Sequence, residues 1–263
     1  MSSLERLLSQ RPRMMPLVVL LCSLLATAGA WYGLHASQQA AAELHFQQLA
    51  DEVVEAVEKR MSDHRQILLG GAGLFEASDS VSREDWRHYA QRLDLDTNYP
   101  GIQGLGFSQV IRPSQLPDFE AEVRREGFTD FSVRPPGPRD LYTSILFLEP
   151  FSGRNLIAFG FDMYSEPMRR AAMRKAAETG EAQLSGKVTL LQDSTGPANA
   201  GVLMYVPVYR TGQPLTNEKE RFDALHGFVY SPYRVNDLMR GILNGRKLQL
   251  DFALFSGVKA DPE

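Results

Sequence analysis

The chain has 263 residues, a formal net charge of −4 at pH 7 and a hydrophobic content of 43%. This acidic balance gives no support for nucleic acid as a partner, because binding to phosphates calls for a basic surface. The single cysteine, Cys22, excludes an internal disulfide and a cysteine-based zinc site. The length suffices for one large hydrophobic core or for two modest ones.

The first strong pattern is the segment "MMPLVVLLCSLLATAGAWYGL", residues 14–34. About 21 residues without a charge span roughly 30 Å as a helix, the thickness of a bilayer core, so we predict a transmembrane helix. A cleaved signal peptide is the alternative, since "ATAGA" contains small residues, but the apolar run is longer than in a signal peptide and ends in Trp31 and Tyr32. Three arginines and one acidic residue precede the run, which predicts a cytoplasmic tail at 1–13.

Residues 35–79 are predicted to form a stalk, helical from Ala36 to about Ala77, because this segment lacks proline. Apolar residues recur there at spacings of four and seven and form a narrow stripe, Leu49, Val53, Val57, Met61 and Leu68. The stripe packs either on the protein's own domain or on a second copy. A single membrane helix that continues into such a stalk favours a homodimer.

A short helix is predicted after the stalk. Ser82 and Asp85 form its capping box, and its inward positions are Trp86, Tyr89, Ala90 and Leu93.

Beyond Asn98 the pattern becomes rich in β-strands. We expect strands at 101–111, 144–151, 156–163, 201–209, 225–231 and 248–255 and helices near 115–126, 168–178 and 234–243. This order predicts an α+β fold with an antiparallel sheet. The charged, turn-rich segment 211–223 is expected to separate two subdomains, 80–210 and 211–263.

Asp162 raises a question, because it ends an apolar run that begins at Leu156. A buried carboxylate without a partner is costly or takes up a proton. One interpretation is that Asp162 caps the following helix. The local sequence weakens it, since Ser165 is a suitable N-cap, Glu166 adds negative charge and Pro167 fits the first turn. The other interpretation is that a ligand satisfies the carboxylate, and the residues alone leave both open.

No catalytic constellation is found in the sequence. The five histidines are scattered and form no HExxH pair, so we expect no metal site and no cofactor. The stretch "GEAQLSGKV" resembles a phosphate-binding loop but has five residues between its glycines, where such a loop has about four. No GxSxG elbow and no kinase or cyclase motif occurs. We therefore expect no enzymatic activity in this stretch.

A family resemblance is carried by "LEPFSGRNLIAFGFDMYSEPMRRAAMRKAAETGEAQLSGKVTLLQD", followed by "GVLMYVPVY". These segments resemble the CHASE domain, the extracellular sensory domain of histidine kinases and diguanylate cyclases. The resemblance covers roughly residues 99–210. The family's fold, a long N-terminal helix followed by two PAS-like subdomains, implies a membrane-distal subdomain at 80–210 and a membrane-proximal one at 211–263.

The resemblance also implies a ligand site. In the plant cytokinin receptors, which are similar, an aspartate at the position of Asp162 accepts hydrogen bonds from the ligand ring, and the backbone of a leucine at the position of Leu184 completes the clamp. A threonine of those receptors falls near Asp193. We therefore expect ligand contacts at Asp162, Leu184 and Asp193. Two carboxylates in one pocket favour a donor-rich or cationic small molecule over a cytokinin.

The anchor and the resemblance together predict a ligand-sensing domain of the bacterial inner membrane. Its sensory part is expected in the periplasm, as a homodimer through the stalk, and its output is expected to be a histidine kinase or a diguanylate cyclase. A membrane-anchored module that binds a protein partner or has a structural role is the alternative. Since no output domain precedes Glu263, we expect either a fragment of a longer receptor or an output on another chain.

Overall fold

The computed structural model describes the backbone of residues 3–193 and 200–243, with side chains from Met15 onward apart from those of residues 193 and 243. The chain forms two compact units, Met1–Glu55 and Ala56–Glu263.

The first unit is the N-terminal part of helix α1 (Ser3–Glu76). Its apolar side chains are exposed from Met15 to Leu34, with Leu17 68% accessible. Such exposure is unfavourable in water, and this part of α1 is long and apolar enough to cross a bilayer. The structure is therefore consistent with the predicted transmembrane span, although a signal sequence has a similar length and composition.

The last part of α1 packs on the domain that follows it. Ile67 and Leu68 are buried in the core of this domain, and Met61 packs against the same cluster. One end of the predicted stripe thus contacts the protein's own domain. Val53 and Val57 are half-buried, and their pairing with a second copy stays a prediction.

Helix α2 (Arg83–Leu93) begins with the predicted capping box. The amide of Ser82 donates to Asp85 Oδ2 at 2.9 Å, and the amide of Asp85 donates to Ser82 Oγ at 3.2 Å. Trp86 is fully buried, and its Nε1 donates to the carbonyl of Leu105 at 3.3 Å. This ring therefore ties α2 to the sheet.

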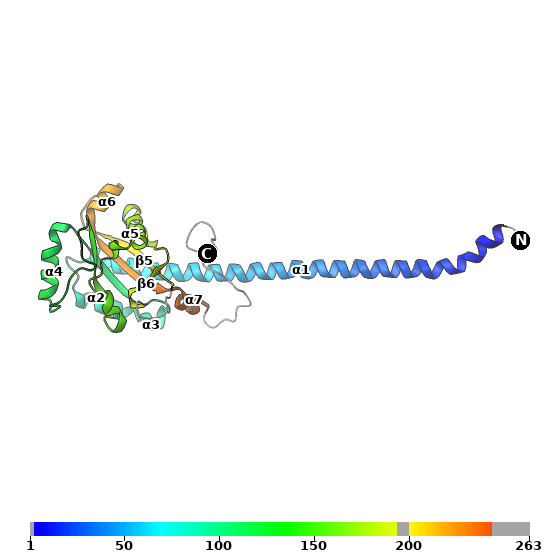
Figure 1. Ribbon diagram of the computed structural model, residues 1–263, viewed down its shortest axis with the longest axis horizontal. Helices are drawn as coiled ribbons and strands as arrows, with labels where there is room; N and C mark the ends of the chain where they lie inside the picture. Colours follow the sequence, from blue (N-terminus) through cyan, green and yellow to red (C-terminus); the bar gives the residue numbers. More distant parts are fainter. Residues whose placement is uncertain (1–2, 194–199, 244–263) are drawn as a thin grey trace. The chain divides into compact units, whose positions relative to one another are not determined.

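The domain is built on an antiparallel sheet, to which the described residues contribute six strands, and this confirms the α+β prediction. The strand order is β2-β1-β6-β5-β3, and β4 pairs with β5. Figure 1 shows β5 and β6 side by side. The strands are β1 (Leu105–Ile111), β2 (Tyr142–Glu149), β3 (Gln183–Leu184), β4 (Val188–Thr189), β5 (Ala200–Tyr209) and β6 (Leu225–Arg234).

Strand β6 lies between β1 and β5 in this sheet. Tyr230 pairs with Gly106 of β1 and with Tyr205 of β5. Residues 225–234 were expected in a second subdomain, but this pairing places them in the same sheet as the strands before residue 210. A second PAS-like subdomain at 211–263 stays a prediction. The strand expected at 248–255 lies outside the described residues.

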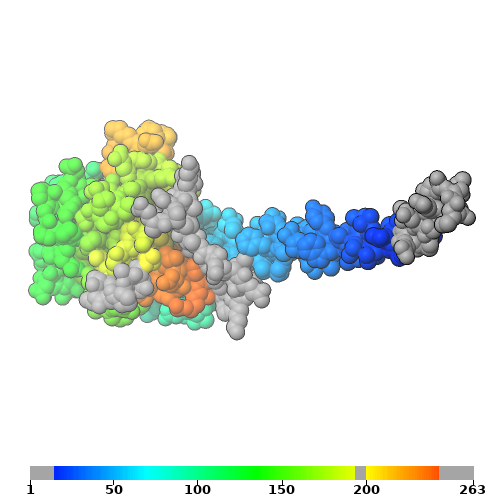
Figure 2. Space-filling view, turned by 45° about the vertical axis from the view of Figure 1, so that its right-hand side comes forward, coloured from blue at the N-terminus to red at the C-terminus, as the bar shows by residue number. Residues whose placement is uncertain are grey.

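The remaining helices and turns connect and cover the strands. In Figures 1 and 2, α4 forms the green end of this unit, and α6 lies on its surface in light orange. The helices expected near 115–126, 168–178 and 234–243 correspond to α4, α5 and α7. The elements are α3 (Leu95–Asn98), α4 (Leu116–Arg125), α5 (Pro167–Thr179), α6 (Glu218–Ala224) and α7 (Val235–Leu243), with 3-10 turns η1 (Pro113–Gln115), η2 (Gly153–Ala158), η3 (Met163–Ser165) and η4 (Leu191–Asp193).

The strand expected at 156–163 is wrong. The chain forms η2 and then η3 there, and Asp162 makes only an isolated bridge to β2. Leu156 and Ile157 are both exposed, so the run lacks the alternation of a half-buried strand. Gly160 has a φ of 80°, a left-handed conformation that interrupts an extended segment.

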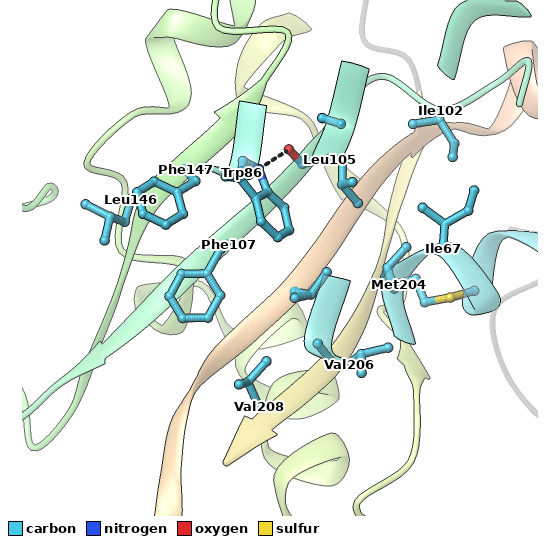
Figure 3. Close-up of a cluster of buried hydrophobic side chains, with 14 of the residues drawn as sticks. Ile67, Trp86, Ile102, Leu105, Phe107, Leu146, Phe147, Met204, Val206 and Val208 are labelled. Carbon is cyan, nitrogen blue, oxygen red and sulfur yellow. Dashed lines mark hydrogen bonds between the residues drawn. The ribbon is translucent and has the colours of Figure 1, made fainter. Parts of the chain in front are cut away.

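Among the described residues, two hydrophobic clusters lie on the two faces of the sheet, because side chains alternate along a strand. On β5, Met204 belongs to a cluster with α1 and α2, whereas Leu203 belongs to a cluster with α5. We call these sides the α1 face and the α5 face. Figure 3 shows the α1 face, where Ile67 and Trp86 lie near side chains of the strands.

Candidate functional site

Asp162 immediately precedes η3 and is fully buried. Its Oδ1 accepts hydrogen bonds from the amides of Thr143 at 2.8 Å and Tyr164 at 3.1 Å, and from the Thr143 hydroxyl at 3.3 Å. Asp162 is therefore the N-cap of η3 and also fastens this turn to β2. The protein itself uses one of the two carboxylate oxygens.

The second oxygen, Asp162 Oδ2, has no hydrogen-bond partner among the described residues. It forms an ion pair with Arg139, whose Nε lies 3.5 Å away and whose side chain is 21% exposed. The Arg139 Nη1 donates instead to the carbonyls of Pro135 and Gly137, at 3.0 and 3.2 Å. The guanidinium thus balances the charge of the carboxylate without satisfying Oδ2 as an acceptor.

Burial raises the pKa of Asp162 above its ordinary value of 3.8. Hydrogen bonds from Thr143 and the positive charge of Arg139 act in the opposite direction but do not cancel the effect of burial. A buried acid with a raised pKa and an unused acceptor is typical of binding sites, although structural networks also contain such groups.

Leu184 and Asp193 are the other two expected contacts. Leu184 lies on β3 at one edge of the sheet, paired with Met204, and is 48% exposed. Asp162 bridges to Ser144 of β2 at the opposite edge. In the sequence, Asp162 precedes α5 and Leu184 follows it. Asp193 ends η4, and its side chain lies outside the described part of the chain.

The expectation that Ser165 caps α5 is wrong. Glu166 is the N-cap: its Oε1 accepts from the amide of Met168 at 3.0 Å and its Oε2 from the amide of Arg169 at 2.8 Å. The position of Pro167 explains this, because proline favours the first helical position and so makes the preceding residue the cap. The Ser165 hydroxyl instead donates to the carbonyl of Asp162 at 2.6 Å.

A small cavity of about 10 Å³ lies on the α5 face, beside η3, and Met163 is part of its wall. It has room for about one water molecule. Two buried polar atoms of lining residues, Arg169 Nε and Tyr230 Oη, have no hydrogen-bond partner among the described residues. Arg169 is held in place by Nη2, which donates to the carbonyl of Thr189 at 3.0 Å. The neighbourhood of Asp162 is therefore tightly packed but incompletely hydrogen-bonded.

Three residues of this site were not found by sequence reasoning. Thr143 lies in an apolar strand, and Arg139 in a loop, so their approach to Asp162 depends on tertiary structure. Arg169 did carry a signal. Helical spacing places it on the same face of α5 as Met173 and Ala176, which are both buried.

The fold and site define a class of protein: an antiparallel α+β domain that follows a long, apolar N-terminal helix and contains a buried, incompletely bonded carboxylate. The family model of the CHASE domain matches residues 79–263. This match covers more than half of the chain, and the chain belongs to the CHASE domain family, as the resemblance predicted. CHASE domains are extracellular sensory domains of receptors. No curated protein matches the chain.

Proposed function

We propose that this chain is the ligand-sensing input domain of a histidine kinase or diguanylate cyclase receptor, anchored in the bacterial inner membrane with its sensory part in the periplasm. Membership in the CHASE family supports the sensory role. The exposed apolar part of α1 supports the anchor. The arginines before it, Arg6, Arg11 and Arg13, support a cytoplasmic N-terminus.

The observation that carries the ligand site is the unbonded Oδ2 of Asp162. Leaving a buried acceptor without a donor costs free energy, and a ligand N–H or O–H group that reaches Oδ2 recovers this cost. Since Oδ1 is already used by Thr143 and Tyr164, the site offers one acceptor oxygen. It therefore suits a single strong donor of the ligand, with Leu184 and Asp193 as the further contacts that we propose.

The ion pair with Arg139 supports one of the two ligand classes that the sequence favours. A neutral donor-rich molecule can hydrogen-bond to Asp162 while the ion pair with Arg139 persists. A cationic molecule must displace the guanidinium, because two positive groups close to one carboxylate repel each other. We propose a neutral donor-rich ligand for the wild-type site, with cations admitted when Arg139 is replaced.

Signalling requires that the ligand bind two arrangements of the protein with different affinities. We propose that these arrangements differ in the packing of two stalk helices in a homodimer. Two contacts support a link between the site and α1. The turn containing Asp162 is fastened to β2, and Phe147 of β2 lies against Phe75 near the end of α1, with ring centres 6.4 Å apart.

The test uses the full chain in a non-ionic detergent, with adenine as the neutral donor-rich probe and benzamidine as the cationic one. Asp162→Asn keeps an acceptor for the η3 cap but removes the charge and one acceptor oxygen. Asp140→Asn, which changes an exposed carboxylate next to Arg139 in the sequence, is the matched control. We expect calorimetric titration to show adenine binding to wild type and control, and binding about ten- to a hundredfold weaker in Asp162→Asn.

A second measurement concerns Arg139→Gln. This variant should bind benzamidine more tightly than wild type does, because the competing guanidinium is absent. Unchanged adenine binding in Asp162→Asn would contradict the proposed site.

The alternative is a module that binds a protein partner or has a structural role and takes no small molecule. The ion pair of Asp162 with Arg139 and the small volume of the cavity beside Met163 support it, because the protein's own side chains occupy this region. Failure of both probes to bind wild type and Arg139→Gln would support this alternative.

A further inference from the structure

A second and much larger hollow lies on the α1 face of the sheet. It is an open groove of about 1030 Å³, between the end of α1, the segment 77–82 that leads into α2, helix α4 and the strands. Figure 3 shows four labelled residues of its wall, Phe107, Leu146, Phe147 and Val208, at one side of the cluster. We call this hollow the α1-end groove. Its volume reaches the upper end of the range for small-molecule sites, about 300–1,000 Å³.

Aromatic rings form much of its wall. Phe75, at the end of α1, lies 4.0 Å from Phe107 between ring centres, 6.0 Å from His226 and 6.4 Å from Phe147. Phe75 and His226 are only half-buried, so part of their ring surface is accessible. Burial lowers the pKa of His226, so this ring is neutral near pH 7. The groove thus presents neutral aromatic surface, which attracts cations through the ring quadrupole.

Among the described side chains that line the groove, more carboxylates than basic groups lack an ion-pair partner. Glu76, Asp79, Glu84 and Glu122 line the groove and are exposed, and they have no ion-pair partner in the described parts of the chain. Arg210 is the one lining cation, among described residues, that has no carboxylate partner.

The other arginine of the lining is already neutralised. Arg83 Nη2 lies 2.9 Å from Glu126 Oε2, and its guanidinium packs 4.6 Å from the ring centre of Phe128 and 5.2 Å from that of Phe147. The side chain is 16% exposed, so it contributes little positive charge to the groove. The position of Arg83 shows that a positively charged group can pack on the phenylalanine rings of the groove.

We propose that the α1-end groove is a second ligand site, which binds a small organic cation with an apolar or aromatic body. Aromatic surface, negative rim charge and volume all favour this class over an anion or a neutral polar molecule. The site is separate from Asp162, because Phe107 belongs to the α1 face and Met163 to the α5 face. A ligand there touches Phe75 and Glu76 directly, so it acts on the end of α1 without passing through the sheet.

The probe is benzyltrimethylammonium, which has a fixed positive charge and no N–H group. It cannot donate a hydrogen bond to Asp162, so its binding is independent of the function proposed above. Benzyl alcohol and benzenesulfonate are the neutral and anionic controls. The reporter is Trp86, whose ring centre lies 5.8 Å from that of Phe75. Trp31→Phe leaves it as the only tryptophan, since the chain has two.

We expect saturable quenching or enhancement of Trp86 fluorescence in the full chain in non-ionic detergent, with a dissociation constant on the order of 1–10 mM, typical of a ligand with few atoms. The double variant Asp79→Asn, Glu122→Gln should weaken binding about fivefold or more, because it removes two rim charges. Glu181→Gln, an exposed carboxylate outside the groove, is the matched control and should bind as wild type does.

Phe75→Leu tests the aromatic wall and should weaken binding of the cation more than that of benzyl alcohol. The proposal is overturned by any of three results: no saturable signal at concentrations on the order of 50 mM, equal binding of benzenesulfonate, or equal affinity in the double variant and wild type. Binding lost in Asp162→Asn would instead place the cation at the other site and also overturn it.

Discussion

The hydrogen bonds of Asp162 predict a difference between two substitutions. Asp162→Ala removes the acceptor of the buried Thr143 amide, whereas the Tyr164 amide keeps the Thr143 hydroxyl oxygen, 2.9 Å away, as its acceptor. An unsatisfied buried donor costs about 1–3 kcal/mol, so the variant should lose roughly 1–3 kcal/mol of unfolding free energy. Asp162→Asn keeps an amide oxygen in the place of Oδ1 and should lose less than about 1 kcal/mol, because it also removes a costly buried charge.

Thermal melting of the full chain in detergent is the assay. For a domain of this size about 1 kcal/mol corresponds to roughly 2–4 °C, so the alanine variant should melt about 2–12 °C below wild type, and the asparagine variant should melt above the alanine variant and within about 4 °C of wild type. Asp140→Ala, which removes an exposed carboxylate, controls for the loss of charge. Equal melting temperatures for Asp162→Ala and Asp162→Asn would refute the reasoning, since Oδ1 would then not be the structural acceptor.

The raised pKa of Asp162 predicts how the stability of the folded protein depends on pH. Because burial raises its pKa in the folded state above 3.8, the folded protein binds more protons than the unfolded chain between 3.8 and the raised value. The contribution of Asp162 to stability is therefore greatest below pH 3.8 and declines as pH rises through this window. Denaturant unfolding at several pH values should show this decline in wild type and not in Asp162→Asn, and an unchanged slope in the variant would contradict it.

Three further predictions concern other elements. Glu166→Ala should lower the free energy of unfolding by about 1 kcal/mol, because it removes the cap of α5. Ser165→Ala should leave the helicity of α5 unchanged. A larger loss of helical circular dichroism in Ser165→Ala than in Glu166→Ala would contradict the assignment of the cap. Burial lowers the pKa of His64 to about 4, so the folded protein should lose up to about 3 kcal/mol as pH falls from 6.5 towards 4; His64→Phe should abolish this loss in melts at pH 5 and 7, and an identical loss would refute it. A cysteine at Val57, in a chain with Cys22 changed to Ser, should crosslink two copies under oxidation, and crosslinking from the charged side of the stalk alone would contradict a dimer through the stripe.

Local signals predicted the helices well because their evidence lies within a few residues. The capping box of Ser82 and Asp85 is such a signal, and α2 begins where it predicts. The same logic, applied to Pro167, would have identified Glu166 as the cap of α5. Ser165 was preferred because short hydroxyl side chains are common caps, but the fixed first helical position of proline outweighs that preference.

Long-range pairing could not be predicted from these patterns. Nothing in the local sequence of β6 indicates that it lies between β1 and β5, since strand order depends on which edges meet in the folded chain. The residues around Asp162 could not be predicted for the same reason. Asp162 was singled out correctly as buried, but the loop residue Arg139 and the strand residue Thr143 reach it only through tertiary structure.

The central position of β6 has a consequence for biogenesis. The strands β1 and β5 both need β6 as a neighbour, and it is the last of the six to leave the ribosome or a translocation channel. Until then each presents an open edge with unpaired amides and carbonyls, which is the usual template for wrong pairing between chains. Pairing between strands that are far apart in the sequence is slow, so the nascent domain needs protection from aggregation until Arg234 has emerged. Truncation before Leu225 should therefore yield an aggregating chain in place of a smaller folded domain.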